Sequence, residues 1–196
     1  MADFVGQNFR GVVRGLESKY NFSLSDDERE GYVKMEEDRV IATLEKKAQP
    51  CVGSTEELER IKQEGKYGMA VVSSSALRRV IASVKKVDQY KYFPEGHIFS
   101  AATSLPKPTT KPDPAIYLWA CEKIGVKPEE CVAVEDSKSG TLSAVRAGIP
   151  TVAYTGSYHD PSKAKEVGDM LVENGAKIIM SHWNEFPEVL KKLEAM

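Results

Sequence analysis

Hydrophobic and polar positions follow two different rhythms along this chain, and the change falls near residue 50. From about Phe4 to Lys47, apolar residues recur every three or four positions, which is the spacing of one face of an amphipathic helix. Within this stretch Ser25 is followed three residues later by Glu28, a pattern typical of a capped helix start. The segment 1–50 is therefore predicted to form a helical hairpin or small bundle.

From Pro50 onward, short apolar runs alternate with amphipathic stretches. Such alternation indicates a parallel sheet with helices on both faces, and runs that are apolar throughout indicate strands buried on both sides. The predicted fold class is α/β, with a sheet domain over residues 51–196. Strands are expected near Tyr67–Val72, His97–Ser100, Cys131–Val134, Thr151–Tyr154 and Lys177–Met180. Helices are expected near Ser54–Gln63, after Ser74, at Asp113–Ile124, at Gly140–Ala147, between the last two strands and at Trp183–Leu193.

Composition narrows the function classes only modestly. The 196 residues are 41% hydrophobic and 29% charged, with a formal net charge of −2. The protein therefore has no positive electrostatic field that would attract nucleic acid or an anionic membrane. The three cysteines show neither a disulfide framework nor zinc-ligand spacing, which favours a reducing, cytoplasmic compartment. No apolar run approaches the roughly 20 residues that span a bilayer, so no membrane partner is expected.

Polar groups gather where predicted strands end. In a parallel sheet, binding groups collect beyond the carboxyl ends of the strands, and Ser73 with Ser74 lies there, before a helix whose N–H groups favour an anion. Lys111 precedes Pro112, a residue suited to a first helical turn, and a cation at that end points to an anion nearby.

The pair Glu135-Asp136 closes the next strand. Adjacent carboxylates are costly to bring together unless a cation compensates, and hard oxygen ligands suit Mg²⁺. Together with the serines and Lys111, this pair predicts a site for a phosphate group and a metal ion.

Each feature also has a simpler interpretation. The serines Ser73 to Ser75 could serve only as a helix N-cap, Lys111 could be a solvated loop residue, and Asp136 or Ser137 could cap the following helix. The shared strand-end placement of all three features favours a common site.

Three segments resemble the second, third and fourth motifs of the haloacid dehalogenase superfamily. They are Ala-Val-Val-Ser-Ser-Ser ending at Ser75, Lys-Pro-Asp-Pro-Ala-Ile-Tyr from Lys111, and Val-Glu-Asp-Ser-Lys-Ser-Gly ending at Gly140. The N-terminal hairpin resembles the helical cap of the beta-phosphoglucomutase and phosphoglycolate phosphatase branch, and Pro50-Cys51-Val52-Gly53 is similar to its return linker. The first motif, Asp-x-Asp-Gly-Thr, does not occur in the sequence.

The resemblance implies a Mg²⁺-dependent phosphohydrolase that acts on a small phosphorylated metabolite, such as a sugar phosphate. Ser73, with Ser74, would hydrogen-bond the phosphoryl group, and Lys111 would neutralise its charge. Asp136, with Glu135, would hold Mg²⁺. The cap would choose the substrate, and its polar positions are Gln7, Asn8, Arg10 and Arg14, whose alternative interpretation is an exposed helix face.

In the family, the absent motif carries the aspartate nucleophile on the first, central strand. The resemblance therefore implies a Rossmann-like core without that strand, and we expect a truncated chain with very low activity. A non-catalytic protein that binds a phosphometabolite is the alternative. Without the central strand, its two neighbours are expected to close up, to accept the N-terminal segment, or to take a strand from a second chain in a homo-oligomer.

Overall fold

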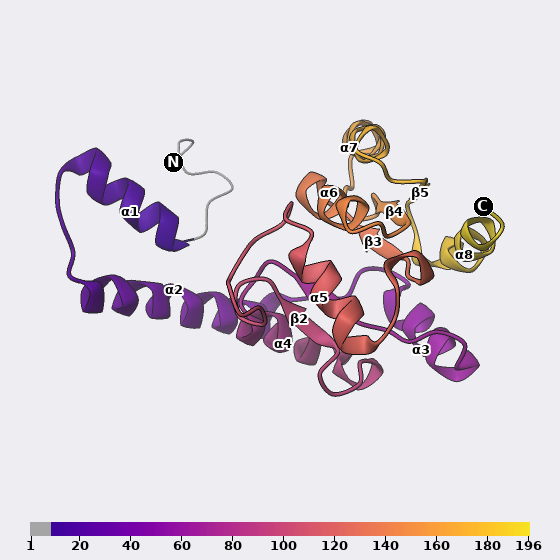
Figure 1. The fold of residues 1–196 in the computed structure, drawn as a ribbon, viewed down its shortest axis with the longest axis horizontal. Coiled ribbons are helices and arrows are strands. Elements are labelled where there is room, and N and C mark those ends of the chain that lie inside the picture. Colours follow the sequence, from indigo (N-terminus) through magenta and orange to yellow (C-terminus); the bar gives the residue numbers. More distant parts are fainter. Residues whose placement is uncertain (1–8) are drawn as a thin grey trace. The chain divides into compact units, whose positions relative to one another are not determined.

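The computed structural model describes residues 9–196 (Figure 1). The chain forms two compact units, Met1–Ala48 and Gln49–Met196. Each unit is described by itself.

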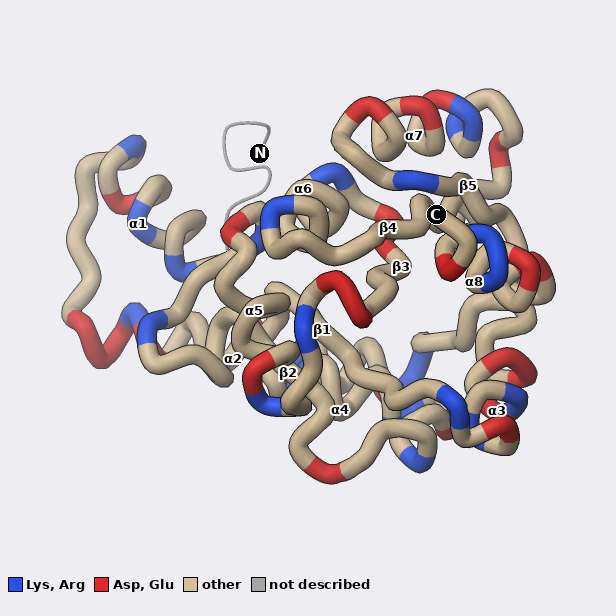
Figure 2. The backbone as a smooth tube through the Cα atoms, turned by 45° about the vertical axis from the view of Figure 1, so that its right-hand side comes forward, with Lys and Arg blue, Asp and Glu red and all other residues tan. Residues whose placement is uncertain are grey.

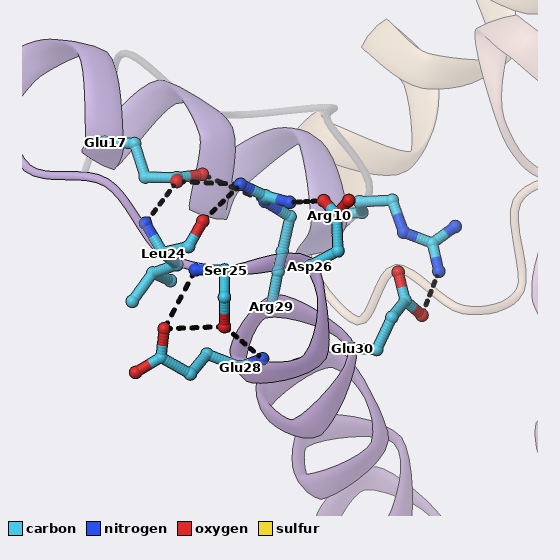
Figure 3. Close-up of polar contacts among 8 residues, drawn as sticks. All are labelled: Arg10, Glu17, Leu24, Ser25, Asp26, Glu28, Arg29 and Glu30. Atoms are coloured by element: carbon cyan, nitrogen blue, oxygen red, sulfur yellow. Dashed lines mark hydrogen bonds and ion pairs between the residues drawn. The ribbon is translucent and has the colours of Figure 1, made fainter.

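The first unit is a hairpin of two helices, α1 (Phe9–Tyr20) and α2 (Asp26–Lys47). The predicted capping box is confirmed, because the Ser25 hydroxyl accepts the Glu28 N–H and the Glu28 carboxylate accepts the Ser25 N–H. Arg29 ties the two helices together: its guanidinium donates to the Glu17 carboxylate at 2.9 Å and to the carbonyl of Leu24 at 3.0 Å (Figure 3). The turn between the helices is thus fixed by one largely covered ion pair.

We expect the hairpin to lose stability in acid through Glu17. Hydrogen bonds from Arg29 and the Leu24 N–H lower the pKa of Glu17 from 4.5 to about 2. A carboxyl whose pKa is lower in the folded state stabilises that state above its unfolded pKa, and the stabilisation is lost as the pH falls toward 2. Glu17→Gln should reduce the acid dependence of thermal unfolding, followed by circular dichroism. An equal reduction in the exposed control Asp27→Asn would contradict this role.

The second unit alternates helices and parallel strands, as the sequence pattern predicts. Its strands are β1 (Val71–Ser73), β2 (Ile98–Ser100), β3 (Ala133–Glu135), β4 (Thr151–Tyr154) and β5 (Ile178–Met180). Its α-helices are α3 (Ser54–Glu64), α4 (Leu77–Lys86), α5 (Ala115–Ile124), α6 (Lys138–Arg146), α7 (Pro161–Glu173) and α8 (Phe186–Glu194). Short 3₁₀ turns lie at Tyr90–Tyr92, Pro128–Glu130 and Trp183–Glu185.

The strands form two separate parallel sheets. β1 pairs with β2, and β4 lies between β3 and β5 (Figure 2). In Figure 1, β2 lies with α4 and α5, whereas β3 and β4 lie with α6. Among residues 9–196, β1 and β3 are not hydrogen-bonded to each other, so the expectation that these two strands close up is wrong.

Helix α5 spans both sheets from one face. One apolar cluster joins Phe99 of β2 and Ala133 of β3 through Ile116, Tyr117 and Ala120 of α5. A second cluster packs α8 and Ile61 of α3 against β4 and β5. Helix α5 therefore bridges the two sheets, even though no strand of the described residues connects them.

Several element boundaries differ from the sequence prediction by a few residues, among them the starts of β1 and α5. The strand expected from Tyr67 is paired only from Val71 onward, because Tyr67 and Met69 pack against the second apolar cluster. The helix expected from Asp113 starts at Ala115, whose N–H donates to the Asp113 carboxylate at 2.8 Å. Pro112 accordingly lies in a turn before the helix.

Candidate active site

Ser73 and Ser74 follow the end of β1. The Ser73 hydroxyl accepts the Ser75 N–H at 3.1 Å, and the Ser74 hydroxyl accepts the Lys111 N–H at 3.0 Å. The first N–H of α4, at Leu77, donates instead to the Thr103 hydroxyl at 3.1 Å. The interpretation of these serines as a side-chain N-cap is therefore wrong, and Ser74 binds the loop that carries Lys111.

Lys111 is a buried cation. Its ammonium donates to Glu135 Oε1 at 2.5 Å and to the carbonyl of Val72 at 2.9 Å, and it lies 3.4 Å from the hydroxyl of Tyr117. The side chain of Lys111 is only 9% exposed. The interpretation of this residue as a solvated loop lysine is therefore wrong. Its position joins the edge of β1 to the end of β3.

Glu135 ends β3 and faces inward. Its Oε1 accepts the Tyr117 hydroxyl at 2.5 Å besides the Lys111 ammonium. Burial, together with the charge of Glu135, raises the pKa of Tyr117, so the phenol stays protonated and donates. A Cβ at Gly140 of α6 would lie 1.8 Å from Glu135 Oε2, so only glycine fits at that position.

The sequence left open whether Asp136 or Ser137 caps α6, and the structure distinguishes the two residues. The Ser137 hydroxyl caps α6 by accepting the Gly140 N–H at 3.1 Å. Asp136 is exposed, and its carboxylate is not needed for the cap. Adjacent residues thus serve different purposes: Ser137 starts the helix, and Asp136 remains open to solvent.

A cavity of about 370 Å³ brings these groups together at the carboxyl ends of β1 and β3. Its lining consists of serines, two carboxylates, one lysine and two valines: Val72, Ser73, Ser74, Ser75, Lys111, Val134, Glu135, Asp136, Ser137 and Ser139. This cavity is lined by all five residues that the sequence predicts for the phosphate and metal site: Ser73, Ser74, Lys111, Glu135 and Asp136. Their chemical roles stay predictions.

Tyr117 and Gly140 contribute to the geometry but were not assigned roles from the sequence. Both lie inside the quoted motif segments, so a signal was available. Tyr117 is six residues after Lys111, and Gly140 is five residues after Glu135. What the sequence alone could not provide is the inward direction of these positions on α5 and α6.

The residues proposed for substrate choice belong to the unit Met1–Ala48. Gln7 and Asn8 lie outside the described residues. Arg10 and Arg14 are exposed on α1, and the Arg10 guanidinium pairs with Glu30 at 2.6 Å. Their role stays a prediction.

The donor set fits Mg²⁺ through Asp136. This ion commonly uses one or two protein carboxylates and completes its shell with water and phosphate oxygens. Oε1 of Glu135 already accepts Lys111 and Tyr117. Within residues 9–196, no group of three or more His, Cys, Asp or Glu side chains gathers as a metal site. Asp136 is therefore the open carboxylate, and Glu135 is the carboxylate that holds Lys111.

Comparison with known proteins identifies the protein family of this chain. A family model for haloacid dehalogenase-like hydrolases matches residues 1–154, and the chain belongs to this family. Among residues 9–196, no helix is long and apolar enough to cross a membrane.

Curated relatives include phosphatases. The chain is 33% identical over 141 residues to a phosphorylated carbohydrates phosphatase of Thermotoga maritima, a match that covers 72% of this chain and 59% of the relative. It is 32% identical over 112 residues to a phosphoglycolate phosphatase of Thiobacillus denitrificans, covering 57% of this chain and 47% of the relative. The chain thus spans about half the length of these relatives.

Solved structures share the fold over nearly the whole chain. A haloacid dehalogenase-like protein of unknown function from Agrobacterium tumefaciens matches with a TM-score of 0.70 at 28% identity, covering 97% of this chain and 80% of the other. A putative beta-phosphoglucomutase from Thermotoga maritima gives a TM-score of 0.67 at 28% identity, covering 97% and 81%.

Removing the Glu135 carboxylate should destabilise the protein strongly. Glu135→Ala leaves the ammonium of Lys111 buried beside Tyr117 without its counter-charge, a change that typically costs about 3 kcal/mol of unfolding free energy or more. Urea unfolding measures this loss. Asp136→Asn is the matched control, because this neighbouring carboxylate is exposed and its loss should change stability by about 0.5 kcal/mol or less. Equal losses in the two variants would contradict the assignment.

Proposed function

We propose that this chain is the phosphate-binding part of a Mg²⁺-dependent phosphohydrolase that acts on a small phosphomonoester of the sugar-phosphate kind. The observation that carries this proposal is the cavity at the ends of β1 and β3, where Ser73, Ser74 and Lys111 converge with Asp136. Hydroxyl donors and a buried ammonium match the oxygens of a phosphoryl group. Family membership and the phosphatase relatives support the same reaction class.

Each residue has a distinct part in this proposal. Ser73 donates its hydroxyl to a phosphoryl oxygen, and Lys111 compensates the phosphoryl charge. Glu135 and Tyr117 position the Lys111 ammonium through the contacts at 2.5 and 3.4 Å. Ser74 fixes the backbone of the same loop. Glu135 and Tyr117 therefore act on the phosphate only through Lys111, whereas the Ser74 hydroxyl, which accepts the Lys111 N–H, can still donate its own proton to a phosphoryl oxygen.

Asp136 would hold the Mg²⁺ ion, with phosphate oxygens and water completing its shell. When bound, the ion would supply positive charge against the phosphoryl oxygens. Substrate choice is assigned to the hairpin, with Gln7, Asn8, Arg10 and Arg14 as the positions to test.

We further propose that the chain turns over little substrate by itself. The only carboxylates that line the described cavity are Glu135 and Asp136. Glu135 is held by Lys111, and Asp136 is assigned to the metal, so neither is available to attack a phosphoryl group. Without an attacking carboxylate, binding groups alone retain only a small part of the rate enhancement.

Inorganic phosphate should bind through Lys111 even without turnover. A ligand that binds only the folded state raises the melting temperature, so added phosphate should raise the Tm of the unaltered chain. This shift should shrink in Ser73→Ala and disappear in Lys111→Gln. The comparison uses the phosphate-induced shift of each variant, because Lys111→Gln also lowers the starting stability. Lys107→Gln, at an exposed lysine in the same loop, is the control and should keep the full shift.

Phosphate release from a panel of phosphomonoesters with Mg²⁺ tests turnover. The chain should stay close to background, whereas a version extended upstream of Met1 by a strand ending in Asp-x-Asp should release phosphate. Normal turnover of the unextended chain that is lost in Asp136→Asn would contradict the proposal of low activity. Phosphate binding with no release by either version would favour a non-catalytic, phosphometabolite-binding role.

A further inference from the structure

We propose that Cys121 and Cys131 form a redox modification site, at which a low-molecular-weight disulfide such as oxidised glutathione converts the two thiols into one intramolecular disulfide bond. The bond would fasten helix α5 to the segment that leads into β3. Neither cysteine lines the cavity at the ends of β1 and β3, so this inference does not rest on the proposed phosphate chemistry.

The two thiols lie side by side in the structure. Cys121 Sγ and Cys131 Sγ are 3.9 Å apart, and both residues are free cysteines. The S–S bond of a disulfide is about 2.05 Å long, so the two sulfur atoms must approach by about 2 Å to bond. Cys131 lies between the 3₁₀ turn Pro128–Glu130 and β3, outside both regular elements, where the chain can adjust more easily than within a strand.

Helix α5 and β3 pack against each other along one face. Tyr117 and Cys121 are one turn apart on α5, so both lie on the same side of the helix. The backbone of Cys131 is extended, with φ −108° and ψ 162°, and alternation along an extended chain places Cys131 on the same face as Glu135. The hydrogen bond from Tyr117 to Glu135 therefore lies at one end of this interface, and the cysteine pair lies at the other.

The two thiols differ in exposure, which determines the order in which they react. Cys121 is 5% exposed and belongs to the apolar cluster around α5. Cys131 packs against that cluster but is only half-buried, and its thiol donates to the carbonyl of Lys127 at 3.4 Å. A reagent from solution therefore reaches Cys131 first, and Cys121 is the thiol that completes the bond.

The reaction is two successive thiol–disulfide exchanges. The thiolate of Cys131 attacks one sulfur of oxidised glutathione, the S–S bond of the reagent breaks, and one glutathione thiolate leaves. The sulfur of Cys121 then attacks the Cys131 sulfur of this mixed disulfide and releases the second glutathione. Two protein thiols are oxidised, one reagent disulfide is reduced to two thiols, and the two cysteine protons pass to the glutathione thiolates.

The surroundings of Cys131 make this bond slow to form and hard to reduce. Burial, with contributions from Cys121, Glu130 and Glu129, raises the pKa of the Cys131 thiol to about 12. Only the thiolate attacks a disulfide, and below its pKa the thiolate fraction grows about tenfold with each pH unit. A thiol of high pKa is also a poor leaving group, so the finished disulfide resists attack by other thiols.

The disulfide would stabilise the helix that bridges the two sheets. Helix α5 contacts Phe99 of β2 and Ala133 of β3 within one apolar cluster. A covalent link from α5 to the start of β3 restricts the unfolded chain and keeps this helix on β3. Oxidation is therefore expected to raise the melting temperature.

The test uses the full chain carrying Cys51→Ser, because Cys51 is exposed and would react alone. Incubation with oxidised glutathione in alkaline buffer should lower the protein mass by two hydrogen atoms, and dithiothreitol should restore it. Trypsin cleaves after Lys123, between the two cysteines, so the oxidised chain should yield two peptides joined by the disulfide. Its Tm should rise by about 5 °C or more, and the rate of oxidation should rise about tenfold per pH unit.

Two variants of the Cys51→Ser chain serve as controls. Adding Cys121→Ala should leave one glutathione on Cys131 without a gain in Tm, and adding Cys131→Ala should leave the buried Cys121 unmodified. The proposal is overturned if the joined peptides are absent, if the Cys51→Ser chain itself keeps glutathione on Cys131, or if the oxidised chain melts at an unchanged or lower temperature.

Discussion

The ion pair between Lys111 and Glu135 is the contact on which the arrangement of the site depends. Both side chains are about nine-tenths buried, so each charge needs partners within the protein. Lys111 also donates to the carbonyl of Val72, and Glu135 also accepts the Tyr117 hydroxyl. One cluster of four groups therefore connects a loop, a helix and the edges of two sheets that share no strand pairing within residues 9–196.

The other polar contacts of the site keep that cluster in place. Ser74 fixes the backbone of the Lys111 loop, Ser137 sets the first turn of α6, and Gly140 leaves room for the Glu135 carboxylate. Because these contacts organise Lys111, the cavity can present a buried cation beside the edge of β1.

The sequence was informative where a local pattern has a single physical cause. Alternating apolar runs predict the parallel strands and their covering helices, and the Ser25 and Glu28 pair predicts the start of α2. Strand-end placement also predicted that Ser73, Lys111 and Asp136 would meet. For Ser73 and Asp136 that meeting follows because the carboxyl ends of parallel strands lie at one edge, whereas Lys111 reaches the site from the loop after β2.

Tertiary contacts determine the features that the sequence did not reveal. The sequence pattern could not show that Glu135 and Asp136 have different surroundings. Only the packing of α5 shows that Glu135 meets Tyr117 and Lys111. Likewise, the partner of the first N–H of α4 is Thr103, which is distant in sequence from the serines expected there. The two separate sheets depend on long-range pairing, which no local pattern encodes.

The ammonium on the Val72 carbonyl has a consequence for the behaviour of the protein in concentrated solution. An uncovered strand edge is a template on which other chains can grow a sheet, and proteins often blunt such edges with lysine. Here the Lys111 ammonium binds the carbonyl of Val72, which is the backbone acceptor of β1 that does not face β2. Any aggregating strand must approach this buried cation, so self-association into fibrils is disfavoured at the side of β1 that pairs with no strand of the described residues.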